Sequence, residues 1–456
     1  MRELLVHRPL MLLATGLVLG VAAVNHWFAI ALLIALLAFL RALKPGIACA
    51  LGFCLGAALA PGTHAAMFPK QWIDVEARVV SVPKLYSDEI SATIETRNGI
   101  RLQMGGAPTL HFGIGDTVHV KGDAKPLTVG SERLADRGIS GRLWADQLKV
   151  IAPAPFILRI GQAWRNSFIS FVDATLPVRA ANATEAVCFN VQSRLDDQDR
   201  EAFSRAGTVH AISASGLHVG LIALVLFGLL SLIPIPRGFQ LGVVAAVLAL
   251  YAIASGLHPP VVRAAILFSV LSAAYLVRRD PDLLSALGLA AVVQLLWDPT
   301  AIYDVGFQFT FVVLLAVGVF PVYAVRRPPA RFRMALHVWD RIRRPLLVVV
   351  AAAPIAAYQF GAVSITSIFA NLSLIVALPV LIVGALISHL MSFVSSGAAE
   401  GLMTWIVGPL SGWLLFVTDH LGGEWAVLNV PEFSGYWLFV IYSAFLLVWR
   451  PRLRPA

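Results

Sequence analysis

Polar side chains that can donate or accept hydrogen bonds gather at one place in an otherwise apolar stretch of the sequence. The group lies near residue 210 and comprises His210, Ser213, Ser215 and His218. His210 and His218 are eight residues apart, about two helical turns, so a helix here would carry both on one broad face. Gly216 permits close approach of a second backbone or a break in the helix. Because polar groups are costly in lipid, we expect this group to face a bundle interior or a water-filled path.

Two interpretations of this group stay open. Hydroxyl and imidazole groups could line a path that passes a sugar-phosphate backbone without gripping individual bases. The same groups could instead form hydrogen bonds between helices that fix the bundle. A bound metal is not expected, because two histidines without a neighbouring cysteine or carboxylate make a poor metal site.

Three further polar residues in apolar segments are candidates for the same path. Arg263 follows two prolines at the expected outer end of a helix, where its guanidinium could draw a phosphate inward or snorkel to lipid headgroups. Gln308 and Asn371 occupy similar positions, where cross-helix hydrogen bonds are the commoner role. The predicted channel-lining residues are therefore His210, Ser213, Ser215, Gly216, His218, Arg263, Gln308 and Asn371.

The composition predicts a polytopic membrane protein to position these residues. The 456 residues are 58% hydrophobic and only 13% charged, with a mean hydropathy of +0.78, and a soluble fold cannot bury that much apolar surface. A span needs about 20 mostly apolar residues, and about 12 apolar segments recur along the chain, which predicts an all-α membrane bundle. The first run lacks a cleavage site, so we expect a retained anchor.

A long polar region divides the apolar segments. We expect N-terminal membrane helices over 1–66, a β-domain over 67–152, an amphipathic helical linker over 153–205 and a membrane channel domain over 206–456. Lys and Arg cluster in alternate loops, so the positive-inside rule places both termini in the cytoplasm and the polar region outside it. The expected location is the inner (cytoplasmic) membrane, crossed several times.

The polar region carries short stretches of alternating apolar and polar residues separated by turn signals. They cover 74–82, 90–96, 100–104 and 117–124, and they predict a small closed barrel of the OB type, with a purely structural β-domain as the alternative. OB barrels often bind single strands by stacking bases on aromatic rings. The candidate DNA-binding residues are Trp72, Lys84, Tyr86, Arg97, Arg101, Lys121 and Lys125.

The run FSRAGTVHAISASGLHVGLI at 203–222 resembles the signature of the ComEC-type competence family. Stretches beginning at Val261, Asp298 and Tyr358 look like the later blocks of that family in the same order. FQFT stands where the family more often has an FQLS-like string, which leaves Gln308 in place. The resemblance implies an inner-membrane channel that imports single-stranded DNA during natural transformation.

Many members of that family continue into a metallo-β-lactamase-like domain, for which this sequence has no counterpart. The 11 histidines contain no H-x-H-x-D-H cluster, and no P-loop or dinucleotide fingerprint is present. We therefore expect no enzyme activity, catalytic residue, metal or cofactor. The implied partners are single-stranded DNA, membrane lipid, a separate DNA receptor, a separate nuclease and a cytoplasmic motor ATPase. The alternatives are an envelope-biogenesis membrane enzyme or a small-solute transporter.

Overall fold

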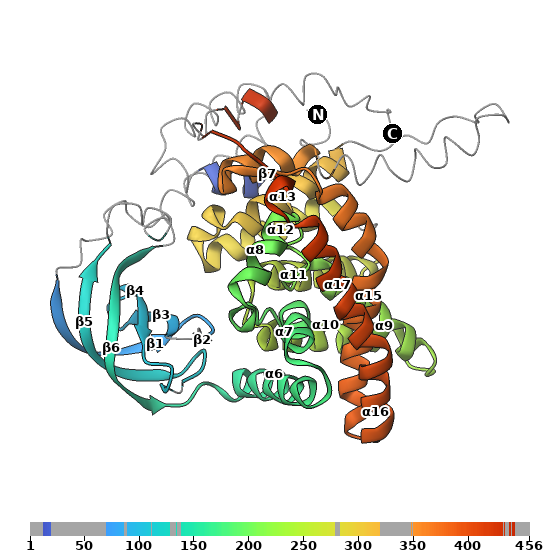
Figure 1. Ribbon diagram of the computed structural model, residues 1–456, viewed down its shortest axis with the longest axis horizontal. Coiled ribbons are helices and arrows are strands. Elements are labelled where there is room, and N and C mark those ends of the chain that lie inside the picture. Colours follow the sequence, from blue (N-terminus) through green and yellow to red (C-terminus); the bar gives the residue numbers. More distant parts are fainter. Residues whose placement is uncertain are drawn as a thin grey trace. The chain divides into compact units, whose positions relative to one another are not determined.

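The chain forms two compact units, which are described separately (Figure 1). Unit 1 combines Met1–Ala60, Ala273–Ser364 and Val427–Ala456, and unit 2 combines Pro61–Ser272 and Ile365–Ala426. The computed structural model describes residues 12–19, 70–85, 89–110, 112–127, 134, 138–278, 283–319, 348, 350–431, 433, 437–438 and 440–442.

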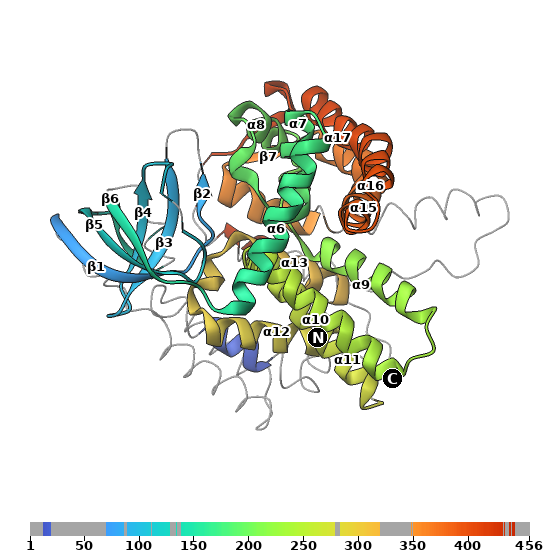
Figure 2. The ribbon, with the colours of Figure 1, turned by 90° about the horizontal axis from the view of Figure 1, so that it is seen from below.

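Unit 2 begins with a separate β region. Its strands are β1 Gln71–Val79, β2 Lys84–Leu85, β3 Ile90–Thr96, β4 Arg101–Gly106, β5 Thr117–Pro126 and β6 Ile139–Ala152. They form a six-stranded sheet in the order β1-β5-β6-β4-β3-β2, in which only the β4–β6 pairing is parallel. The long strands β5 and β6 curve together (Figure 2). The predicted strands agree with β1, β3, β4 and β5 to within a few residues at each end.

Alternating residues of these strands build the core of the β region. In β4 and β5, every second side chain is buried, including Leu102, Met104, Val118 and Val120, as the two-residue period of a strand requires. The predicted barrel is not closed, so this part of the prediction was wrong. β1 meets β3 over only three residue pairs at its C-terminal end, so the β region is an open sheet whose ends touch briefly.

The described part of unit 2 has ten helical elements besides the 3-10 turn Glu424–Ala426. They are α6 Phe156–Thr175, α7 Val178–Phe189, the 3-10 turn Gln192–Arg194, α8 Asp197–Arg205, α9 Gly216–Ser231, α10 Arg237–Ala254, α15 Ser367–Ser392, α16 Ser396–Leu402, the π-helical turn Met403–Val407 and α17 Gly408–Leu421. Helix α11, Pro259–Leu276, crosses the division between the units. Figure 2 shows α17 beside α7, α8 and α15.

Large buried side chains join these helices in one hydrophobic core. Phe168 of α6, Phe189 of α7 and Phe203 of α8 lie in it. The Tyr251 hydroxyl of α10 donates to the backbone carbonyl of Cys188 over 2.6 Å, which satisfies a polar group that would be costly to bury alone. Residues 155–205 thus pack in the same core as α10, α15 and α17.

Unit 1 is described in shorter pieces. They include α12 Leu283–Trp297, the 3-10 turn Pro299–Tyr303, α13 Val305–Val319, and the paired strands β7 Ala362–Ser364 and β8 Val427–Asn429. A small core surrounds Leu17, Leu295 and Phe307.

Four helices are long and apolar enough to cross a membrane by length and composition: Arg237–Ala254, Pro259–Leu276, Ser367–Ser392 and Ser396–Leu421. They support the predicted membrane character. The described residues do not show about 12 spans, and the predicted segments before residue 67 lie outside them except for 12–19.

Candidate functional site

The N-terminus of α9 is built by a reciprocal contact between its cap and its first turn. Ser215 has the extended backbone of a helix cap, and its N–H donates to Nδ1 of His218 over 3.0 Å. Nδ1 therefore acts as the acceptor, which assigns the ring proton to Nε2 in the neutral tautomer. Nε2 is buried and lies near the Val187 backbone of α7 without completing a hydrogen bond of good geometry. His218 thus fixes the start of α9 and points its second nitrogen inward.

Two further histidines lie close to His218. The side chain of His210, in the loop before α9, interacts with that of Asn371 of α15. Nδ1 of His258, just before α11, lies 3.1 Å from the carbonyl oxygen of Ala214. Both rings interact electrostatically with that of His218. Three imidazoles and one amide therefore converge from the ends of α9, α11 and α15, although the described residues hold no group of three metal-ligating side chains that could bind an ion.

Helix α11 places Arg263 near this cluster. A Cβ added to Gly216 would lie 3.6 Å from the Cβ of Ala264, so the first turns of α9 and α11 are in contact. Arg263 precedes Ala264 and is 2% exposed. Ser213 is half-buried in the loop. The structure therefore brings His210, Ser213, Ser215, Gly216, His218 and Asn371 together, with α11 beside them.

Gln308 lies in unit 1 and has its own contacts there. Its Nε2 donates to the carbonyl oxygen of Ile302 over 3.0 Å, and its Oε1 accepts from Nε2 of Gln359 over 2.9 Å. Asp304 caps the same helix by accepting from the N–H of Phe307. These bonds match the cross-helix role that is common for glutamine in membrane helices.

The candidate DNA-binding residues of the β region are mostly engaged in surface ion pairs. Lys121 contacts Asp74 over 2.7 Å, Lys125 contacts Asp123 over 3.7 Å and Arg101 contacts Glu95 over 3.8 Å. Arg97 pairs with Glu76, Lys84 is exposed, and Tyr86 lies outside the described residues. Exposed pairs of this kind contribute about 0–1 kcal/mol, so a competing anion can displace them at little cost. Trp72 is 63% exposed.

Comparison with known proteins finds a family match over the C-terminal part of the chain. Residues 187–455 match the family model described as Competence protein, which is more than half of the sequence. The chain belongs to this competence-protein family. It is 31% identical over 149 residues to ComE operon protein 3 of Bacillus subtilis (strain 168), and the match covers 33% of this chain and 19% of that relative's length. No solved structure matches the chain.

The family match includes the polar cluster at α9 and excludes the β region. It begins in α7 and runs through α9, α10, α11, α15 and α17. The six described strands of the β region all end before residue 187, so the function of this region has to be argued from its own residues.

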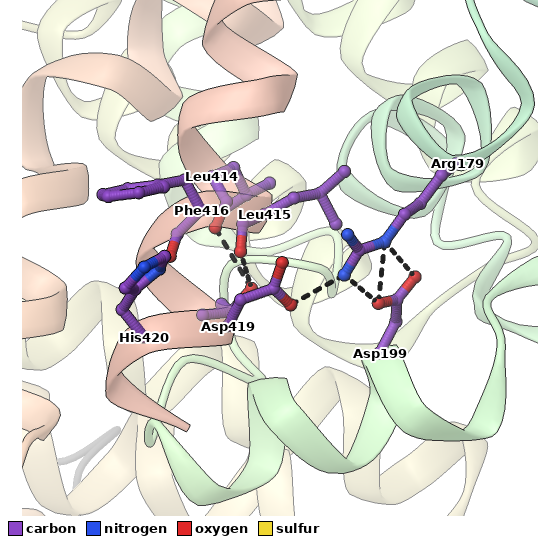
Figure 3. Close-up of polar contacts among 8 residues, drawn as sticks. Arg179, Asp199, Leu414, Leu415, Phe416, Asp419 and His420 are labelled. Atoms are coloured by element: carbon purple, nitrogen blue, oxygen red, sulfur yellow. Dashed lines mark hydrogen bonds and ion pairs between the residues drawn. The ribbon is translucent and has the colours of Figure 1, made fainter. Parts of the chain in front are cut away.

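Sequence analysis missed an ion cluster that joins α7, α8 and α17. Arg179 donates from Nε and Nη2 to Asp199 over 3.0 and 2.6 Å, and from Nη2 to Asp419 over 2.7 Å (Figure 3). The two carboxylates raise the pKa of Arg179 above its usual value. The only sequence signal was the presence of basic residues among the aromatic residues of an amphipathic stretch. That local pattern cannot identify a partner for Arg179 that lies 240 residues away.

A second network lies between α6, α7 and the 3-10 turn at 192–194. Arg194 donates to both oxygens of Glu185, at 2.7 and 2.9 Å, and to both oxygens of Asp173, at 3.0 and 3.1 Å. Glu185 is fully buried, and burial raises its pKa to about 8 against the opposing effect of Arg194, with Asp173 adding to the rise. One guanidinium thus bridges a buried carboxyl group of α7 and a more exposed one of α6.

His389 of α15 is the third feature that the sequence did not reveal. Its ring is 1% exposed and lies 5.5 Å from Phe168, 5.7 Å from Phe171 and 5.2 Å from Phe393 between ring centroids. Within the described part of the chain, neither ring nitrogen has a hydrogen-bond partner. The imidazole packs as an aromatic ring between α6 and the end of α15.

Proposed function

We propose that this competence protein is an inner-membrane channel that imports single-stranded DNA during natural transformation. The observation that carries the proposal is the overlap between the family match and the polar cluster at α9. Membership of the competence family supports DNA as the transported molecule. The cluster supplies polar groups at the ends of apolar helices, where a polyanion needs them.

The chemistry of the cluster suits a sugar-phosphate backbone. The first turn of α9 has unpaired backbone N–H groups and the positive end of a helix dipole, both of which favour an anion. Imidazole and amide groups of His210, His218 and Asn371 can donate hydrogen bonds without recognising a base. The guanidinium of Arg263 can hold a phosphate with two parallel bonds. We propose that these residues, with Ser213, Ser215 and Gly216, line the path, whereas a channel-lining role for Gln308 stays a prediction from the sequence.

The β region is proposed to receive the strand outside the cytoplasmic membrane. Its parallel β4–β6 pairing, together with the contacts of β1 with both β5 and β3, supports an OB-like topology, which is often only partly closed. The alternating basic loops support cytoplasmic termini and an outward β region.

The proposed channel has no motor of its own. DNA import then requires partners that drive or capture the strand, and we propose a separate DNA receptor, a separate nuclease and a cytoplasmic ATPase. The chain itself is proposed to conduct the strand and not to act as an enzyme.

Uptake of labelled DNA tests the proposal. A strain that lacks this gene is complemented with the wild type, with His218→Ala, with Arg263→Ala and with Ser231→Ala, a control at the far end of α9. Loss of a helix-cap contact costs about 1 kcal/mol and loss of a cross-helix hydrogen bond about 0.6 kcal/mol, so membrane-inserted protein should stay near normal in all variants. Internalised DNA should fall in the first two variants and stay normal in the control.

Arg263→Lys sharpens this test, because lysine keeps the charge but loses the planar fork. Partial uptake is expected from it. Wild-type uptake in the complete absence of the protein would remove the channel function. Normal uptake with normal abundance in both alanine variants would take His218 and Arg263 off the path.

A further inference from the structure

Two tryptophans of the β region share one exposed face of the sheet. Trp72 of β1 and Trp144 of β6 both lie directly opposite Asp123 of β5. Opposed residues project from the same face, and neighbouring strands are about 4.8 Å apart, so the two Cβ atoms are roughly 10 Å apart. The side chains are 63% and 46% exposed, and neither ring contacts another aromatic ring of the described residues. Such large rings are rarely left in water without a partner.

Glycines shape the sheet beneath Trp144. Gly105 of β4 pairs with it, and a Cβ added there would lie 3.3 Å from the ring atom Cε3. The ring therefore lies against a glycine, with its other face in solvent. Gly122 stands at the register shift between β5 and β6, and a side chain there would overlap the carbonyl oxygen of Trp144. The sheet thus holds the indole as a flat, supported platform.

Three basic side chains lie on the same face of the sheet as the two rings. Arg78, Arg142 and Lys149 project from the same face as the tryptophans, as their strand pairings show, and none has an ion pair within the described residues. The carboxylates left unpaired nearby are Asp146 and Glu89. Lys121 and Lys125 add two cations whose exposed pairs with Asp74 and Asp123 can be exchanged. A small positive excess remains for a polyanion.

We propose that the exposed face of β1, β5 and β6 binds one strand of nucleic acid, with bases stacked on Trp72 and Trp144 and phosphates on Arg142 and Lys149. The proposal rests on the proposed function of DNA import, because it identifies where the β region holds the strand. Base stacking on exposed aromatic rings combined with a basic groove is the general means of binding single strands without sequence preference.

On the same outer side of the sheet, strands β3 and β4 offer no aromatic ring on which a base could stack. Their outward side chains are Ser91, Thr93, Glu95, Arg101 and Gln103, with no aromatic ring among them. OB folds commonly bind on the second and third strands, which are β3 and β4 in this order. The proposed strand-binding surface therefore lies on β1, β5 and β6, on the same outer side of the sheet as the β3 and β4 surface that fold analogy suggests and beside it.

The same face is a poor membrane anchor. Insertion at a lipid interface needs a continuous apolar surface, but Asp123 separates the two indoles. Asp74, Lys121, Lys125 and Arg142 fill the adjoining positions. Two isolated flat rings among charges suit planar ligands.

Binding of a fluorescein-labelled oligothymidylate to the full chain in zwitterionic nanodiscs tests the face. Trp72→Ala and Trp144→Ala should each weaken binding by at least about fivefold, the lower end for the loss of one stacked base. Trp72→Phe and Trp144→Phe keep a ring and should retain most of the affinity. Trp425→Ala is the matched control, because Trp425 is 65% exposed outside the β region, and it should bind normally.

The salt dependence of binding identifies the phosphate contacts. Arg142→Gln and Lys149→Gln should each reduce the slope of log affinity against log salt by about 0.7. Arg237→Gln is the control, since Arg237 lies at the start of α10, outside the β region, and should leave the slope unchanged.

Two outcomes overturn the proposal. One is unchanged affinity in the double alanine variant. The other is quenching of the fluorescence of both tryptophans by brominated phospholipid, measured as the difference between the wild type and the double variant. Such quenching would show that this face contacts the membrane. Either result with intact uptake leaves the channel function standing. The binding proposal and the channel function both fail if the wild type binds no oligonucleotide and DNA uptake does not depend on the protein.

Discussion

Two ion pairs of unit 2 have the same length and very different surroundings. Lys121 contacts Asp74 at 2.7 Å on the outer face of the β region, where each side chain keeps more than 40% of its surface exposed. Arg194 contacts Glu185 at 2.7 Å among the helices, where the glutamate has no exposed surface. Water screens the first pair, whereas the second has replaced water with fixed partners. Distance alone therefore does not say which charges hold the fold and which are free to exchange for a ligand.

The largest effect is expected from removing Arg194 at high pH. At about pH 9 Glu185 is ionised beside Arg194, and Arg194→Met leaves the carboxyl group to stay buried without its partner or to take up a proton, which costs up to about 3–5 kcal/mol. At pH 6 the glutamate is protonated, so the loss should be about 1–3 kcal/mol. SDS titration of the protein in mixed micelles measures the free energy of unfolding at both pH values. An equal loss at both would show that Glu185 does not change its charge in this range.

The wild type should itself lose stability as pH rises. The pKa of Glu185 is raised from 4.5 to about 8 by burial, so the folded state holds a proton that the unfolded state has released. The contribution is fully present below about pH 4.5 and is lost as pH rises through 8, by at least about 1 kcal/mol. Glu185→Gln should flatten this profile. A wild-type profile that rises between pH 5 and 8 contradicts the assignment.

An intermediate effect is expected at Arg179. Its guanidinium is about half exposed, but Asp199 is 7% exposed, so Arg179→Gln leaves a mostly buried carboxylate with weaker bonds and should cost about 1–3 kcal/mol. A double-mutant cycle with Asp199→Asn measures the coupling between the two. Asp419→Asn is the comparison, because Asp419 is more exposed and should couple less. Coupling near zero for both pairs would make the cluster in Figure 3 energetically irrelevant.

The smallest effect is expected on the β region. Lys121→Gln breaks an exposed pair, so the free energy of unfolding should change by less than about 1 kcal/mol. The pKa of Asp74 is lowered by its bonds to Lys121 and His119, and it should move back toward its usual value in this variant. NMR titration of a protein labelled at aspartate follows the shift. A loss of several kcal/mol would mean that the pair holds the sheet together.

Local sequence patterns predicted much of the secondary structure. Period-two alternation located β3 at 90–96 without error, because each strand residue reports directly on which face it occupies. Long apolar runs predicted spanning helices, and four are found. The expectation that one helix carries both His210 and His218 was wrong, because α9 begins at Gly216 after its cap Ser215 and leaves His210 in the preceding loop.

Sequence alone indicated a membrane protein with a separate β region, because composition and periodicity are properties of neighbouring residues, and the motif at 203–222 indicated the competence family by resemblance. Only the tertiary structure decided the partners. Arg179 meets Asp419 across 240 residues, and His210 meets Asn371, through packing that no local pattern encodes. The same holds for Trp72 and Trp144, which share a face only because β5 pairs with both β1 and β6. Register between distant strands, set by the buried side chains of the whole sheet, decides which exposed residues lie together.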